Sequence, residues 1–396
     1  MINKNKRIII INGTIITPFH LVSGKAIIIE KGKIIEIVNK EELKTATLTG
    51  VKVIEAKDKF IVPGYIDIHI HGGGGSDVMD GDYEAINQIA IAHSHFGTTS
   101  FLPTTMTMSK DKIIRSLRSI CGAVKKGTAG AEILGIHMEG PYINPEKKGA
   151  QKEEDIKKIS IEEFLEFNQA SGNLIRLVTI APEMPGAIGL IKYLYKQGII
   201  ASVGHSNATY KQVQEGIQAG LSHVTHIFNA MRGLHHREPG VVGAALSSPK
   251  LTVEMIADGV HLHPMVLKML TQIKESEKLV LITDAMRATG FKEGTYDLGG
   301  QEVIVTQGQA KLKNGTLAGS VLTMDKAVKN LVTKVGISLL NAVQMASYNP
   351  AKCLGIDDKK GSLEPGKDAD IVILNKNLEA ELTVVAGKVV YRRKEI

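Results

Sequence analysis

The sequence contains few of the residues that build disulfide frameworks, aromatic surfaces or membrane spans. Among its 396 residues it has two cysteines, no tryptophan and only 4% aromatic residues. Two cysteines are too few for a disulfide framework, so a reducing compartment, the cytoplasm, is expected. No apolar stretch approaches the roughly 20 residues that a membrane span needs, and the N-terminal apolar run is too short for a signal peptide. We therefore predict a soluble cytoplasmic protein without a membrane partner.

Positive charge is present but is not concentrated. The 48 lysines and arginines exceed the 41 acidic residues, which gives a formal net charge of +7. A nucleic-acid interface requires that such charge gather on one face, whereas here the basic residues are scattered among the acids. We therefore predict no nucleic-acid partner, and we note that a small anionic substrate would suit the charge equally well.

One stretch combines a strand pattern with groups that bind metals. Along Tyr65–His71, isoleucines alternate strictly with Asp67, His69 and His71. A period of two predicts a β-strand with one aliphatic face and one face that carries a carboxylate and two imidazoles. A lone strand histidine is usually a surface or core residue, but a pair two positions apart favours a metal site.

The middle of the chain repeats short apolar segments, each followed by a stretch with helical periodicity. The eight expected strands are Tyr65–His71, Thr99–Pro103, Ile133–Glu139, Ile175–Ala181, Ile199–Gly204, His223–Phe228, Thr252–Asp258 and Leu279–Asp284. Eight such units are typical of an α/β fold of the (β/α)8, TIM-like barrel type. A doubly wound sheet is the alternative, but it needs fewer strands and a glycine turn for phosphate after the first. We predict a barrel over residues 63–361, interrupted by a β-hairpin at Tyr296–Thr316.

Both ends of the chain have a different texture. Residues 1–62 and 362–396 consist of short β segments joined by Asn-Gly, Lys-Gly and similar turns. Such segments predict strands with tight connections. We expect the two ends to form one small β-sandwich domain together.

Polar residues recur where the predicted barrel strands end. They are His69 and His71, His137 and Glu139, His205, His223 and His226, Asp258 and His261, and Asp284. Each has an ordinary explanation alone, such as a helix cap, but barrel active sites lie at this end of the strands. Histidine and carboxylate ligands suit a divalent ion that activates water for hydrolysis. One further carboxylate must move the proton, and Asp284 fits that role.

Several longer motifs resemble a known family. They are PGYIDIHIHG, GIHMEGPYINPEKKGAQ, SVGHSNA, THIFNAM, REPGVVGAA, ADGVHLHP, LITDAMRATG, GTLAGSVLTM and NPAKCLGIDDKKGSLEPGKDADIVIL. The first and last resemble the amidohydrolase superfamily in general. The others, in this order, resemble the N-acetylglucosamine-6-phosphate deacetylases within it. The resemblance covers nearly the whole chain.

The resemblance implies roles for individual residues. Glu139, His205 and His226 would be the core metal ligands, and Asp284 the catalytic acid and base. Only part of the family keeps the His69–His71 pair, so a second ion, with Glu139 as the bridge, is a hypothesis. The implied substrate contacts are Asn229, Ala230, Arg237 and His261 at the sugar phosphate, Leu317, Ala318 and Gly319 near the acetyl group, and Gln151 in place of a histidine. The amide of Gln151 would orient the substrate carbonyl or a hydroxyl.

The implied activity is metal-dependent hydrolysis of the acetamide of N-acetyl-D-glucosamine 6-phosphate to D-glucosamine 6-phosphate and acetate, in amino-sugar catabolism and cell-wall sugar recycling. The cofactor would be Zn, Fe, Mn or Co, with one or two ions in each subunit of a homodimer. The alternatives are another amidohydrolase, acting on a cyclic amide or an N-acyl amino acid, and a non-catalytic barrel homologue. We expect structural roles for the remaining histidines His93, His95, His137 and His223, and solvent exposure for His235 and His236.

Overall fold

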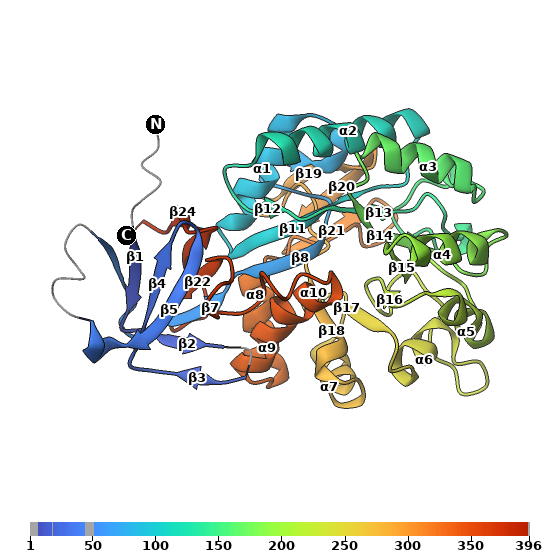
Figure 1. The fold of residues 1–396 in the computed structure, drawn as a ribbon. Coiled ribbons are helices and arrows are strands. Elements are labelled where there is room, and N and C mark those ends of the chain that lie inside the picture. The colour runs from blue at the N-terminus through green and yellow to red at the C-terminus, as the bar shows by residue number, and fades with distance from the viewer. Residues whose placement is uncertain (1–6, 18, 44–50, 395–396) are drawn as a thin grey trace.

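The computed structural model describes residues 7–17, 19–43 and 51–394. They form a helix-covered barrel and, beside it, two smaller sheets (Figure 1). The first and last described strands, β1 (Ile8–Ile11) and β24 (Lys388–Arg392), both belong to the smaller part.

Parallel strands make the wall of the barrel. In order around it they are β8 (Tyr65–Ile70), β11 (Thr98–Thr105), β13 (Ile136–Glu139), β14 (Ile175–Ile180), β15 (Ile200–Val203), β16 (His223–Val224), β17 (Thr252–Ile256) and β18 (Leu279–Ile282). A short strand, β12 (Glu132–Ile133), pairs with the other end of β11. The wall closes between β18 and β8, where the Asp284 amide donates to the His69 carbonyl at 3.0 Å. The predicted (β/α)8 barrel is confirmed.

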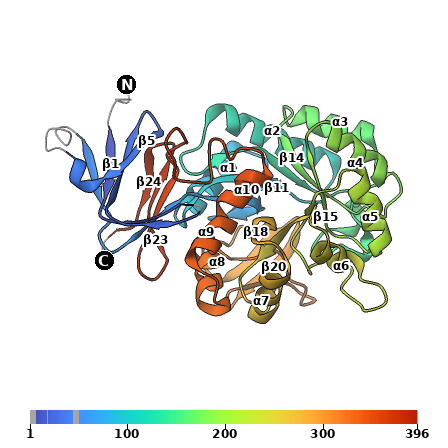
Figure 2. The same ribbon diagram turned by 60° about the horizontal axis from the view of Figure 1, so that its bottom comes forward.

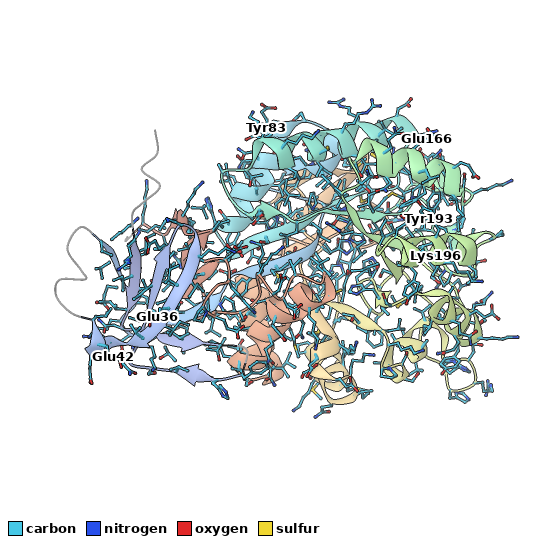
Figure 3. The ribbon with its side chains drawn as sticks, in the orientation of Figure 1. Glu36, Glu42, Tyr83, Glu166, Tyr193 and Lys196 are labelled. Atoms are coloured by element: carbon cyan, nitrogen blue, oxygen red, sulfur yellow. The ribbon has the colours of Figure 1, made fainter. Side chains whose placement is uncertain are left out.

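Helices cover the outside of the wall (Figure 2). They are α1 (Tyr83–Ser94), α2 (Lys110–Lys126), α3 (Ile161–Ala170), α4 (Ala187–Lys196), α5 (Tyr210–Ala219), α6 (Gly240–Ser247), α7 (Pro264–Ile273), α8 (Met324–Asn330), α9 (Leu339–Ala346) and α10 (Tyr348–Cys353). On α2 the residues Ile113, Leu117 and Ile120 are fully buried, and their helical spacing fixes the face that packs on the wall. Glu166 on α3 and Lys196 on α4 lie on the opposite, exposed side (Figure 3). In the parts of the chain described here, no helix has the length and apolarity to cross a bilayer.

The predicted β-hairpin insertion has a third strand. It consists of β19 (Gly294–Leu298), β20 (Gln301–Thr306) and β21 (Gln309–Leu312), paired in antiparallel order. The polar sequence QAKL gives β21 little strand signal of its own, and pairing with β20 decides its conformation. The segment Leu317–Gly319 follows the insertion in the chain. It is held against the insertion by a hydrogen bond from the Ala318 amide to the Ala310 carbonyl on β21.

The smaller part is a β-sandwich. One sheet has the order β5 (Lys33–Asn39), β4 (Lys25–Glu30), β1 and β6 (Lys52–Glu55). The other has the order β24, β23 (Ala380–Val385), β22 (Ile371–Leu374), β7 (Phe60–Pro63), β2 (Thr14–Ile16) and β3 (Leu21–Val22). Buried isoleucines of both sheets, such as Ile10, Ile27, Ile61 and Ile371, share one core. The predicted fold class is confirmed, whereas the proposed boundaries at residues 62/63 and 361/362 stay a prediction.

An ion cluster around the buried Lys360 joins the two parts. The Lys360 ammonium lies 2.7 Å from carboxylate oxygens of both Glu132, on the barrel, and Asp370, next to β22, and 3.2 Å from Asp368. Lys360 and Asp370 are each only 5% exposed. Their charges are therefore compensated by each other rather than by water.

Candidate metal centre and active site

The carboxyl ends of the barrel strands bring the predicted polar residues to one place. The strand alternation of β8 directs His69 and His71 to the inside, where both are buried. His205, His226 and Asp284 follow their strands with φ of 47°, 27° and 51°. Side chains other than glycine seldom adopt this left-handed backbone, and such strain is concentrated at functional sites. The turns aim these three side chains across the mouth of the barrel.

The first set of converging groups contains Glu139, His205 and His226. Glu139 Oε1 lies 3.2 Å from Nε2 of each histidine, and the two Nε2 atoms are 3.2 Å apart. Ligands that share a tetrahedral ion at ~2.1 Å are ~3.4 Å from one another. The spacing of these three donors fits one divalent ion.

A second set lies beside the first. His69 Nε2 and His71 Nε2 are 3.2 Å apart. Asp284 Oδ1 is 3.6 Å from the former and 3.3 Å from the latter. Glu139 lies between the two sets, because its Oε2 is 3.3 Å from His71 Nε2. The geometry therefore fits two ions with Glu139 in the bridging position.

Hydrogen bonds on the far side of three of the four rings fix their orientation, whereas the buried Nδ1 of His226 has no partner among the described residues. Nδ1 of His71 lies 3.2 Å from the Thr104 carbonyl, and Nδ1 of His205 lies 2.9 Å from the Lys147 carbonyl. Nδ1 of His69 lies 3.1 Å from a Glu254 carboxylate oxygen. An Nδ1 that donates its proton leaves the Nε2 lone pair free for a metal.

The carboxylates and imidazoles of the two sets compensate one another. Burial acts to lower the pKa of His71, but hydrogen bonds to Asp284 and Glu139 outweigh it and raise the pKa to about 9. Burial acts to raise the pKa of Glu139, but the charges of His69 and His205 hold that pKa well below its usual range. A metal bound at His71 would take the place of the proton that this raised pKa favours.

A cavity of about 210 Å³ opens onto both sets. The predicted site residues that line it are His71, Glu139, Gln151, His205, His226, Asn229, Ala230, His261, Asp284, Leu317 and Gly319. His69 and Ala318 do not line the cavity, and both are fully buried. Arg237 is the predicted residue that the structure does not bring to this cavity. It is exposed, and its guanidinium lies 2.8 Å from His236.

Two of the lining side chains have defined partners. The Gln151 amide donates to Glu139 Oε2 at 2.7 Å, and its carbonyl accepts from the Thr107 amide at 2.8 Å. His261 Nδ1 lies 2.7 Å from Asp258 Oδ2. Burial acts to lower the pKa of His261, but the hydrogen bond and charge of Asp258 outweigh it, so the pKa is raised. His261 is therefore more readily protonated than a free imidazole, and its ring lines the cavity.

Glu254 is the functional candidate that sequence reasoning missed. It lies in the middle of β17, and its side chain is fully buried. It contacts the rings of His69 and His223, each at 3.1 Å. The one available signal was a charged residue inside an apolar strand, because a buried charge requires partners.

The remaining histidines do not line the cavity, although the His137 ring packs on that of His69 with 4.5 Å between centroids. His93 donates to the Gly72 carbonyl at 2.9 Å, and His137 bonds to the Thr179 hydroxyl at 2.8 Å. His95 stacks on Tyr391 with 4.5 Å between ring centroids. The remaining pair, His235 and His236, is exposed.

Comparison with known proteins gives a consistent result. Residues 60–390 match the family model described as the amidohydrolase family. The N-acetylglucosamine-6-phosphate deacetylase of Bacillus subtilis is 43% identical over 341 residues, which cover 85% of this chain and 86% of that one. The N-acetylgalactosamine-6-phosphate deacetylase of Escherichia coli O157:H7 is 40% identical over 85% of this chain and 89% of its own. A crystal structure of the N-acetylglucosamine-6-phosphate deacetylase from Pasteurella multocida superimposes with a TM-score of 0.91 at 33% identity, covering 97% of this chain and 99% of that one.

Proposed function

Because this chain belongs to the amidohydrolase family, we propose that its barrel hydrolyses the acetamide of N-acetyl-D-glucosamine 6-phosphate. The products are D-glucosamine 6-phosphate and acetate, as in amino-sugar catabolism. The observation that carries the proposal is the pair of histidine–carboxylate sets that share Glu139 on the floor of one cavity. Relatives named for this deacetylation, at up to 43% identity, support the choice of substrate.

The cofactor in this proposal is a divalent metal. Glu139, His205 and His226 would hold one ion, and His69 and His71 would hold a second, with Glu139 within reach of both. The donor set accepts Zn, Fe, Mn or Co. When bound, the metal polarises the amide carbonyl and acidifies water.

Asp284 carries the proton in this mechanism. Its carboxylate lines the cavity beside His71. It accepts a proton from the attacking water and passes that proton to the nitrogen as the carbon–nitrogen bond breaks. The departing amine therefore leaves neutral.

The remaining lining residues position the substrate. Asn229, Ala230 and the His261 ring face the sugar phosphate, and the Gln151 amide orients both Glu139 and the substrate carbonyl. The acetyl methyl group packs near Leu317 and Gly319, with Ala318 as support beneath them. These assignments are the ones that the family resemblance implies, and all of these residues except Ala318 line the cavity.

We also propose that the protein is a cytoplasmic homodimer in which Arg237 reaches the cavity of the partner subunit. Two free cysteines support a reducing location. The exposed stripe of Met265, Met269 and Ile273 on α7, each at least 55% exposed, supports an interface. Arg237 does not line the cavity of its own chain, yet a guanidinium suits bidentate phosphate binding.

A mixing experiment tests the dimer arrangement. Subunits of R237A and D284N, each impaired alone, are unfolded, mixed and refolded together. If Arg237 acts across the interface, half of the sites in a mixed dimer with one of each subunit receive both Arg237 and Asp284, and activity returns. Activity that stays at the level of the single variants contradicts the arrangement, and light scattering of the wild type measures the dimer itself.

The activity is tested by acetate release from metal-loaded protein. The substrates are N-acetylglucosamine 6-phosphate, its galactosamine epimer and N-acetylglucosamine without phosphate. Fast release from the first alone is the expected result. Equal rates for the first and third substrates would contradict the phosphate-binding site. Faster release from the epimer would indicate a specificity like that in the name of the Escherichia coli relative. Absence of release from all three contradicts the proposed function.

A further inference from the structure

Glu254 connects the two ion-binding sets from beneath. One of its oxygens, Oε2, lies 3.1 Å from His69 Nδ1 and 3.1 Å from the backbone amide of His226. The other, Oε1, lies 3.1 Å from His223 Nε2. The carboxylate thus contacts one residue of each set without facing the cavity.

We infer that Glu254 is the positioning residue that makes the His69–His71 pair able to bind the second ion. By accepting the Nδ1 proton of His69, it selects the tautomer whose Nε2 lone pair faces the cavity. It also fixes the ring plane from the opposite side. A carboxylate partner raises the basicity of a metal-binding imidazole more than a backbone carbonyl does, because it is charged.

The partners of two other ligand rings show why this contact is distinctive. His71 and His205 donate Nδ1 protons to backbone carbonyls, of Thr104 and Lys147. Such carbonyls are present whatever the side chains are. His69 alone among these three rings depends on a side chain for its orientation, so one substitution changes its tautomer.

Substitution of Glu254 should weaken binding of the ion at Glu139, His205 and His226 less than binding of the ion at His69 and His71. Glu254 holds His226 through the backbone amide and not through the ring. The neighbouring Ile227 amide donates to the Glu254 backbone carbonyl at 3.0 Å, a bond that does not need the carboxylate. Loss of the side chain therefore misplaces the His69 ring while His226 stays anchored.

The ordinary explanation for Glu254 is a buried pair with His223 that only stabilises the barrel. His223 donates to Glu254 and lies 3.5 Å from the Cys353 sulfur. A purely stabilising pair would not distinguish the two ions. Selective loss of one ion is therefore the signature of a positioning role.

The test compares Glu254→Gln and Glu254→Ala with Asp67→Asn as a matched control. Glutamine keeps the shape and one acceptor oxygen, and His223 can present its other tautomer to the amide. Asp67 is an equally buried carboxylate on β8, but it bonds to Thr283 and to the backbone amide of His69, not to a ring. Asparagine keeps the shape of Asp67 and one acceptor oxygen, so this control changes a buried carboxylate without touching a ring.

The measurement is equilibrium binding of Co²⁺ to metal-free protein, followed by metal analysis and by the visible absorption of the ion. We expect two Co²⁺ per subunit for the wild type and for Asp67→Asn. The weaker site should lose roughly 10- to 100-fold in affinity in Glu254→Gln, and at least as much in Glu254→Ala, while the tighter site is unchanged.

Three results would overturn the inference: one Co²⁺ per wild-type subunit, two ions bound with wild-type affinity by Glu254→Ala, or equal weakening of both ions. The inference rests on the proposed two-ion site but not on the substrate. A protein that loads two ions, loses one on substitution of Glu254 and yet releases no acetate would refute the proposed function alone.

Discussion

Replacement of Asp284 by asparagine is the most direct test of the proton step, because the backbone at this position accepts asparagine. The residue has a φ of 51°, a region that asparagine and aspartate enter more readily than other side chains. Its amide donates to the His69 carbonyl at 3.0 Å, and its carbonyl accepts from the Ser320 amide at 2.7 Å. Asparagine can keep both bonds and the side-chain volume, so the variant removes the basic oxygen and little else.

The expected loss follows from the role. A positioned general acid or base contributes about 10²- to 10⁴-fold to the rate. At about 1.36 kcal/mol for each factor of ten, turnover should fall as if the barrier rose by roughly 2.7–5.4 kcal/mol. Asp284→Ala should lose activity and, in addition, about 1–2 kcal/mol of folding stability, because alanine lacks a side chain that tolerates the left-handed backbone.

The assay is single-turnover acetate release, with metal content measured on the same sample. The ion held by Glu139, His205 and His226 should remain in Asp284→Asn, since Asp284 is not one of its ligands. A rate within about fivefold of the wild type, with that ion bound, would refute the proton-carrying role. A low rate that recovers fully when metal is added would show instead that Asp284 acts only in metal binding.

Three further changes test the substrate site and the junction. Arg237→Ala should raise KM for the phosphorylated sugar by roughly tenfold or more, with no change for the unphosphorylated sugar, as a lost charge-assisted hydrogen bond predicts; equal changes for both contradict a phosphate contact. The raised pKa of His261 keeps its charge at low pH, and this charge is lost as pH rises through that pKa, so KM should rise with pH. Asp258→Asn removes the main cause of the raised His261 pKa, so the increase of KM with pH should begin at a lower pH. A dependence of KM on pH that is the same as in the wild type would contradict this reasoning. Lys360→Met leaves buried Asp370 unpaired and should cost about 3–5 kcal/mol in urea unfolding, whereas a cost below ~1 kcal/mol would show that the cluster is dispensable.

The sequence predicted the barrel because each strand carries its own short-range pattern. It failed where long-range pairing or backbone turns decide the conformation. The predicted strand His223–Phe228 ends at Val224, because His226 and Phe228 take left-handed φ of 27° and 72°. The predicted strand Ile133–Glu139 is divided into β12 and β13, with a φ of 155° at Gly135. Apolar content alone does not reveal such breaks.

The site residues, too, were predicted where the signal is local in the sequence and missed where it depends on contacts with distant residues. Strand endings and motifs were enough to nominate the groups that the structure places around Glu139. Glu254 was not nominated, because its function depends on contact with His69 on β8, 185 residues away in the chain. Arg237 was nominated for its chemistry, but a single chain does not place it at the cavity.

The pairing of β7 with β22 has a consequence for how the protein is made. Val62 and Val372 are direct partners, yet about 300 residues separate them. At a translation rate of ~5–20 residues per second, β7 waits roughly 15–60 s for its neighbour to leave the ribosome. Closing a flexible loop of that length would cost about 5 kcal/mol of chain entropy, estimated from its logarithmic dependence on length. If the barrel folds before β22 has been synthesised, it holds the ends of the chain segment between β7 and β22 close together. The sandwich is then completed after the barrel.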